Sequence, residues 1–272
     1  MVVHVTQSRL GELFDAAHAE FARWMPLLWV PMGEATVARA DIGWGDRVLD
    51  VCCGAGASAI PAARAVGPQG HVDAIDLAPT LLNQARRTAI GQDLTQLEFS
   101  YADATTWTPP SGSYDIIQCA YGVFFFPDMD NDSRRLVTLL KPGGRFTVTT
   151  WDQHAIVAIG QALGPALAEQ GHTMERLAPS VAAARIHTPE LLRQWLGSLG
   201  LRDLAVTTVN LEIPLDGERA WSFVLGTGLR SLLDGLSEPQ QTQLRDDFVT
   251  GLAEHRIDSL NATSHIGVGA RP

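Results

Sequence analysis

A short apolar segment at residues 47–51 runs into a turn that holds two glycines, and this junction limits the folds open to the chain. The residues from Asp50 to Gly56 read Asp-Val-Cys-Cys-Gly-Ala-Gly. A continuous apolar run of this length suits a strand that is buried on both faces. Glycines let the backbone turn sharply and approach a ligand closely. Because residues 58–66 have helical character, the junction predicts a strand, a ligand-binding loop and a helix in succession.

The alternation of strand and helix continues to residue 150. Helical spacing, with Pro at the start or Gly after the end, predicts helices at 79–90 and 131–140. Strands that alternate with helices form a parallel sheet with helices on both faces. The four further predicted strands of this region are 71–75, 97–101, 114–119 and 145–150.

The regions on either side are mainly helical. Residues 8–39 carry apolar side chains at helical spacing, and Pro26 and Pro31 are expected to break this stretch into pieces. Beyond residue 151 we expect helices at 155–170, 189–199, 218–236 and 238–254, and strands at 204–213 and 259–268.

Composition and charge argue against several classes of partner. The chain is 46% hydrophobic and carries a net charge of −10. Such a surface repels phosphate backbones, so we expect no nucleic-acid partner. The sequence has no secretory signal, no apolar run long enough to span a bilayer and no disulfide framework among its three cysteines. We therefore expect a cytoplasmic protein with no membrane partner, and the sequence leaves a homodimer open.

The glycine loop fits two kinds of adenosine-containing cofactor. Residues 54–59 match G-x-G-x-x-A, and Asp76 lies twenty residues beyond the second glycine, as in dinucleotide-binding enzymes. Asp50, however, would repel a pyrophosphate and suits a cationic amino group. Asp103 ends the third strand, where it can accept a hydrogen bond from an adenine amino group. These acids favour S-adenosylmethionine and leave an NAD-dependent oxidoreductase as an alternative.

In this order the motifs resemble those of class I methyltransferases. Residues 48–56 resemble motif I, Asp76-Leu77 the ribose-binding acid and its neighbour, and residues 101–104 the adenine contact. Residues 114–117 and 139–145 resemble later landmarks of the family. The most similar groups are quinone-biosynthesis C-methyltransferases and natural-product sugar O-methyltransferases. The cofactor site that the resemblance implies consists of Asp50, Cys52, Gly54, Gly56, Asp76, Leu77, Asp103, Ala104 and Cys119.

The resemblance also implies an architecture, namely an α/β fold with a Rossmann-like, mostly parallel seven-stranded sheet. Its last strand is antiparallel, helices cover both faces, and residues 216–256 form a helical cap inserted before that strand. Ligands bind at the carboxyl ends of parallel strands. The expected divisions are an N-terminal helical lid at 1–44, the cofactor-binding half at 45–151, an insertion that contributes to the cap at 152–188, and the rest of the core at 189–272.

Cys52 departs from the family pattern, because the family usually has glycine at this position. The backbone there is expected to adopt a left-handed or extended turn despite the Cβ. A thiol reacts only when its pKa is lowered, and nothing basic lies nearby in the sequence. We therefore interpret Cys52 as a packing residue and Cys53 as part of the core.

The segment after the fourth strand is aromatic where the family often has polar residues, including His. Phe124 and Phe125 fill either the core or an apolar pocket for an aromatic or aliphatic acceptor. The residues predicted to form the substrate pocket are Trp24, Trp29, Tyr121, Phe124, Phe125 and Trp151.

The histidines offer few candidates for a general base. His154 follows the fifth strand at the cofactor end and is the predicted base or substrate ligand. His18 is a second candidate on the lid, and His187 is interpreted as loop structure before a helix. No set of residues has the spacing of metal ligands, so we predict no metal.

These features predict the transfer of a methyl group from S-adenosylmethionine to an O-, N- or C-nucleophile of a small molecule, with S-adenosylhomocysteine as product. Alignment of the reactants supplies most of the acceleration that such a reaction requires. The alternative is a methyltransferase-like protein that binds the cofactor but catalyses another step, such as a cyclisation, or that only binds.

Overall fold

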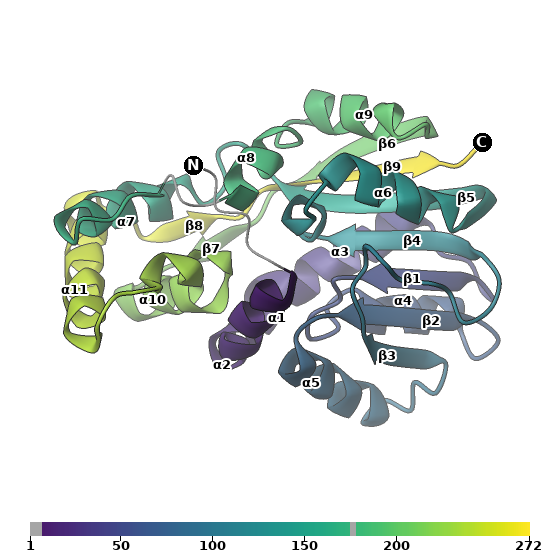
Figure 1. Cartoon of the computed structure of the whole chain (residues 1–272), viewed down its shortest axis with the longest axis horizontal. Helices are drawn as coiled ribbons and strands as arrows, with labels where there is room; N and C mark the ends of the chain where they lie inside the picture. Colours follow the sequence, from purple (N-terminus) through teal and green to yellow (C-terminus); the bar gives the residue numbers. More distant parts are fainter. Residues whose placement is uncertain (1–6, 175–177) are drawn as a thin grey trace.

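A seven-stranded sheet forms the centre of the computed structural model, which describes residues 7–174 and 178–272 (Figure 1). The strand order is β3-β2-β1-β4-β5-β9-β6, and β9 is antiparallel to both neighbours while β1 to β5 pair in parallel. The expected fold is therefore confirmed. The strands are β1 (Arg47–Val51), β2 (His71–Asp76), β3 (Leu97–Tyr101), β4 (Tyr114–Ala120), β5 (Leu140–Trp151), β6 (Arg202–Val209) and β9 (Ser264–Ala270).

Successive side chains of β1 enter different cores because they point to opposite faces of the sheet. Val48 packs with residues of α3 (Val30–Ala40) and α4 (Ala59–Val66). Leu49 belongs to the core on the opposite face, to which α6 (Met129–Thr138) and α9 (Pro189–Ser198) contribute. Helix α5 (Pro79–Ile90) packs on β2 and β3 beside α4. Both faces of β1 are thus buried, which explains its continuous apolar sequence.

A second core lies in the helical cap, which Figure 1 shows at the end of the molecule away from β3. Fully buried Phe223 and Phe248 occupy this core together with Trp24 and Leu28 from the N-terminal helices. The cap therefore shares one packed interior with the start of the chain. Its elements are α7 (Val157–Glu169), β7 (Glu212–Pro214), α10 (Gly217–Gly226), the 3₁₀ helix η4 (Gly228–Leu233), α11 (Glu238–Glu254) and β8 (Ser259–Asn261).

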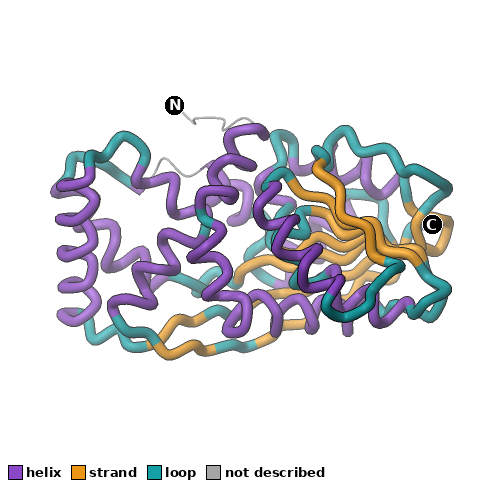
Figure 2. Tube along the Cα trace, turned by 90° about the horizontal axis from the view of Figure 1, so that it is seen from below, coloured by secondary structure: helices purple, strands orange, loops and turns teal. Residues whose placement is uncertain are grey.

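The N-terminal segment stays helical through both prolines, and in Figure 2 helix follows the N-terminal trace. It consists of α1 (Gln7–Ala16), α2 (His18–Trp24), the π-helix η1 (Met25–Trp29) and α3. Pro26 and Pro31 lie in the first turns of η1 and α3, where a missing N–H is tolerated. The expected breaks are thus changes of helix type rather than loops.

Two predicted strands were wrong in extent, because each one is divided. The segment 204–213 contains the end of β6 and the start of β7, and the segment 259–268 contains β8 and most of β9. Strands β7 and β8 are separate from the main sheet. They pair with each other within the cap, with Ile213 opposite Leu260. The β-branched composition predicts strand but does not say which sheet a strand joins.

Among the described helices, none combines the length and the apolar character that crossing a bilayer requires.

Candidate functional site

A cavity of about 360 Å³ lies at the carboxyl ends of the parallel strands. Residues from the loops after β1, β2, β3, β4 and β5 form one side of it. Residues of α1, α2, η1, α8 (Ala178–Ala184) and the start of η4 form the other. The cavity therefore sits where parallel α/β sheets bind ligands, and the cap and the N-terminal helices cover it.

The loop after β1 is built from left-handed backbone. Cys52, Gly54 and Gly56 have φ values of 58°, 53° and 86°. The left-handed turn expected at Cys52 is therefore present, although this residue carries a Cβ. A Cβ at Gly56 would lie 3.1 Å from Ile60 Cδ1, so glycine also permits the close packing of the loop on the following helix. The turn directs the Gly54 N–H towards Asp76.

Asp76 is the half-buried acid at the end of β2, and it lines the cavity together with Leu77. Its Oδ2 accepts a hydrogen bond from the Gly54 N–H, and its Oδ1 accepts one from the Ala78 N–H, both at 2.8 Å. Burial raises the pKa of Asp76, and these backbone donors offset the rise only in part. Each oxygen keeps a second lone pair, so a fixed carboxylate can still accept from two ligand hydroxyl groups.

Asp50 is fully buried beneath the loop and does not itself line the cavity. Its Oδ2 accepts from Gln118 Nε2 at 2.9 Å, whereas its Oδ1 has no hydrogen-bond partner within the described part of the chain. Burial raises the pKa of Asp50 to about 7, and the nearby Ser58 and Gln118 side chains offset only part of this rise. A buried acceptor without a donor needs an explanation, and a donor or cation bound beside Ser58, which lines the cavity, would supply one.

The loop after β3 forms the expected adenine end of the cavity. Ala102 and Ala104 line it, and Leu81 of α5 adds a further apolar surface. Asp103 lies beside this lining, and its Oδ1 accepts from both the N–H and the Oγ1 of Thr105 at 2.8 Å. The arrangement offers flat apolar contacts to a ring and a carboxylate at its edge.

Two cysteines approach the loop after β4. Cys119 is fully buried, and a Cβ placed on Gly122 would lie 2.6 Å from Cys119 Sγ and 2.9 Å from Cys52 Sγ. Gly122 is therefore required by close packing. A hydrogen bond to Cys119, together with burial, holds the pKa of the Cys52 thiol well above its usual value, and burial does the same for Cys53. Both thiols act in packing rather than as nucleophiles.

An aromatic wall faces this loop. Trp29, Tyr121 and Trp151 contact one another, with ring centroids 4.4 Å apart for Tyr121 and Trp151 and 5.6 Å apart for Trp29 and Tyr121. All three line the cavity, as do Phe124 and Phe125. The structure thus brings together five of the six residues predicted for the substrate pocket.

Trp24 is the sixth, and it lies elsewhere. Its side chain is 1% exposed, and its Nε1 donates to Ser222 Oγ at 2.9 Å inside the cap. Phe14 and Phe21, from the same N-terminal helices, line the cavity and were missed. The helical periodicity placed all three on one helical segment but could not say which side meets the cavity.

His154 lies outside the cavity. Its side chain is 73% exposed, and its Nδ1 is 3.2 Å from Asp152 Oδ1. Asp152 does line the cavity, and its Oδ2 lies 3.0 Å from Nε2 of His265, which is 1% exposed. Partial burial raises the pKa of Asp152, but the His154 N–H and the nearby imidazoles outweigh it, so the pKa lies below its usual value.

His187 also lines the cavity, although the sequence suggested only loop structure there. Sequence reasoning missed Asp152 as well. The position of Asp152, directly after a strand end, was a usable signal. The position of His187 in the cavity depends on how α8 and α9 pack, and the sequence offers no local signal for this packing.

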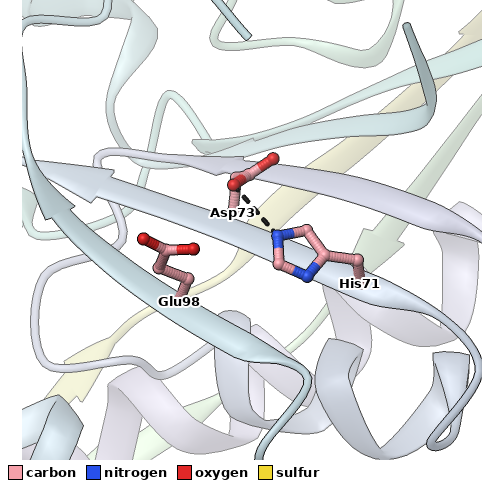
Figure 3. Close-up of side chains that lie close together, drawn as sticks. All are labelled: His71, Asp73 and Glu98. Carbon is pink, nitrogen blue, oxygen red and sulfur yellow. Dashed lines mark hydrogen bonds and ion pairs between the residues drawn. The ribbon is translucent and has the colours of Figure 1, made fainter. Parts of the chain in front are cut away.

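Among the described residues, three side chains of the types that bind metals lie close together outside the cavity. They are His71, Asp73 and Glu98, and Figure 3 shows them. They lie on β2 and β3, and His71 begins β2, at the end of the sheet away from the cavity. Asp73 Oδ1 is 3.1 Å from His71 Nε2, while Oδ2 accepts from Arg47 at 2.9 Å and from the Tyr114 hydroxyl at 2.8 Å. Arg47 balances the charge of Asp73, and Glu98 is exposed, so Asp73 is paired within the fold.

Comparisons with known proteins agree with this geometry. A family described as "Methyltransferase domain" matches residues 48–144. Aklanonic acid methyltransferase DauC of Streptomyces sp. (strain C5) is 34% identical over 144 residues, which is 53% of this chain and 66% of that protein. Nocamycin O-methyltransferase of Saccharothrix syringae is 30% identical over 261 residues, which is 91% of this chain and 89% of that protein.

A solved structure of another protein shares the fold. The crystal structure of the [4+2]-cyclase SpnF has a TM-score of 0.64 and covers 100% of this chain and 98% of its own. At 17% sequence identity this likeness concerns the fold alone.

Proposed function

The chain belongs to the family of class I methyltransferases, and from this premise we propose that it methylates a small apolar acceptor with S-adenosylmethionine. The observation that carries the proposal is the contact between the left-handed loop and Asp76, whose carboxylate is fixed by Gly54 and Ala78 and faces the cavity. The bound cofactor supplies a methyl group on a positively charged sulfur, ready for displacement.

The residues around the cavity fit this cofactor. Asp76 would accept from the two ribose hydroxyls, and Asp103 and Ala104 would hold the adenine. The unpartnered Oδ1 of Asp50 suits the cationic amino group, directly or through water. Gly122 and Cys52, which pack closely together in the wall of the cavity, would lie on the side of the reacting methyl group. A pyrophosphate would face Asp50 and Asp76 without a basic partner, which disfavours the dinucleotide alternative.

The lining also restricts the acceptor. Aromatic side chains dominate it, and neither Lys nor Arg is among the described residues that line the cavity. A phosphate or carboxylate on the acceptor would lose its hydration without gaining a counterion. We therefore propose a neutral or cationic acceptor with an aromatic or aliphatic body. The names of two relatives, aklanonic acid methyltransferase and nocamycin O-methyltransferase, support a small organic molecule as the acceptor. Because the first of these names an acid, the proposal of an uncharged or cationic acceptor rests on the cavity lining of this chain.

Thermal denaturation tests the cofactor, because a ligand that binds the folded state raises its apparent stability. S-adenosylhomocysteine should raise the Tm, and NADH should not. A rise with NADH alone would overturn the proposal.

Incubation with methyl-labelled S-adenosylmethionine tests the reaction and the acceptor class. The probes are 1-naphthol, 1-naphthylamine and 1-naphthoic acid. We expect label in the first two and none in the acid. Binding of S-adenosylhomocysteine without methylation across a broad acceptor panel would favour the alternative, a cofactor-binding protein that catalyses another step.

A further inference from the structure

The cavity offers few groups that can take a proton near neutral pH. Asp76 is held by two backbone N–H groups. The hydroxyl group of Tyr121 lies 2.7 Å from Ser264 Oγ, and burial holds its pKa far above its usual value. The thiols of Cys52 and Cys53 are likewise held in the protonated form. Asp152 has a lowered pKa and is therefore a weak base.

His187 is the remaining titratable group of the lining. Its side chain is half-buried, and among the described side chains, those of residues 7–174 and 181–272, none forms a hydrogen bond or ion pair with it. An imidazole commonly exchanges a proton between pH 5 and 8. A half-buried imidazole that faces an apolar cavity without a partner is available to a ligand.

The backbone holds this imidazole in place. The His187 carbonyl accepts from the Gln153 N–H at 2.9 Å. Ile186 is fully buried on one side, and on the other Thr188 caps α9 by accepting from the Leu191 N–H at 3.2 Å. A base on a rigid segment keeps its orientation towards the reactant, which is what efficient catalysis requires.

An anion lies close by on the neighbouring segment. The bond from Gln153 to His187 brings the end of β5 beside the start of α9, and Asp152 precedes Gln153. The His154 N–H donates to Asp152 Oδ1 at 2.8 Å, and His265 lies 3.0 Å from Oδ2. His265 in turn contacts Thr208 Oγ1 at 3.0 Å. Asp152 and His187 therefore lie on adjacent backbone segments, and both line the cavity.

We propose that His187 is the general base that removes the proton of an acceptor hydroxyl group, with Asp152 as a positioning residue on the adjacent segment. This inference rests on the proposed methyl transfer. The acceptor O–H bond breaks and an N–H bond forms on the imidazole, while the oxygen electron pair bonds to the methyl carbon. The electron pair of the broken C–S bond stays on sulfur, which becomes a neutral thioether.

Turnover of 1-naphthol tests the role directly. General bases contribute about 10²- to 10⁴-fold, so His187→Ala and His187→Gln should lower kcat about 100-fold while the Kd of S-adenosylhomocysteine changes less than threefold. Free imidazole should restore part of the activity of His187→Ala. His255→Ala, at the exposed end of α11, is the matched control. Unchanged kcat in both His187 variants would overturn the proposal.

A spectroscopic measurement separates this inference from the proposed function. The absorption of 4-nitrophenol distinguishes phenol from phenolate, so its bound form in the presence of S-adenosylhomocysteine reports proton transfer without turnover. We expect a larger ionised fraction on the wild type than on His187→Ala or His187→Gln, and an intermediate fraction on Asp152→Asn. Equal spectra, or no binding of 4-nitrophenol, would overturn the role of His187. Failure to methylate 1-naphthol with the spectral difference intact would instead point to the wrong acceptor class.

Discussion

The two sides of the cavity are built by different means. On the side of β1, β2 and β3, carboxylates are fixed by neighbouring backbone and side-chain donors, as Asp76 is by Gly54 and Ala78. On the side of the cap and the N-terminal helices, the lining is mostly apolar, and rings such as Trp29 and Phe21 stack on each other at 5.1 Å.

This difference follows from what each side is proposed to bind. A cofactor with constant polar groups needs donors and acceptors in constant places. A buried polar group that is left without a hydrogen-bond partner costs about 1–3 kcal/mol. An apolar acceptor is held by burial, which depends on area and not on direction. The cofactor side can therefore keep short sequence motifs, while the acceptor side changes with the packing of the cap.

The largest effect is expected in the cap core. Phe248 of α11 is fully buried, so Phe248→Ala should lower the free energy of unfolding by about 4 kcal/mol. Urea denaturation measures this, with Val157→Ala at an exposed position of α7 as control. If the two sides are separable, the Kd of S-adenosylhomocysteine changes less than threefold. A change above tenfold would show that cap packing also sets cofactor affinity.

The next effect concerns the fixed acid of the cofactor side. Asp76→Ala removes a charged acceptor and also releases the loop at Gly54, so affinity for S-adenosylhomocysteine should fall about 100-fold. Isothermal titration calorimetry measures the Kd, with the exposed Glu98→Ala of β3 as control. An unaltered Kd would mean that another residue holds the ribose.

The pH dependence of Asp50 gives a smaller effect. Its pKa is raised to about 7, so its contribution to stability is present at low pH and is lost as the pH rises towards 7. A cationic ligand favours the charged form, so the affinity for S-adenosylhomocysteine should fall about tenfold between pH 7.5 and 6. Calorimetry at several pH values tests this. The same slope in Asp50→Asn would assign the titration to another group.

The smallest effect is expected at the loop itself. A left-handed residue with a Cβ costs about 1 kcal/mol, so Cys52→Gly should leave the Tm unchanged or slightly higher and the cofactor Kd within threefold. Cys52→Val places a β-branched side chain at the same φ of 58° and should lower the Tm. Equal Tm values for the two variants would show that the loop tolerates strain without cost.

Local sequence patterns were sufficient to predict the elements and the acids on the side of the cavity formed by β1, β2 and β3. The bounds of β1 and β3 and of α5 agree with the periodicity and the flanking glycines and prolines. Asp50 and Asp76 lie in the last two residues of their strands, and Asp103 lies two residues beyond β3, so a parallel sheet necessarily gathers the three acids at one edge. The left-handed turn at Cys52 likewise followed from a local comparison with glycine.

Long-range packing decided the rest. Only the tertiary structure turns Trp24 into the cap, leaves His154 exposed, and pairs Asp152 with His265, which lies more than a hundred residues further along the chain. It also divides the predicted sixth and seventh strands between two sheets and brings His187 into the cavity. The sequence by itself thus determined the sheet, the loop and the positions of the three acids, because their signals lie within a few residues of each other. Tertiary structure determined the acceptor side, because its contacts join segments with no periodic or spacing relation.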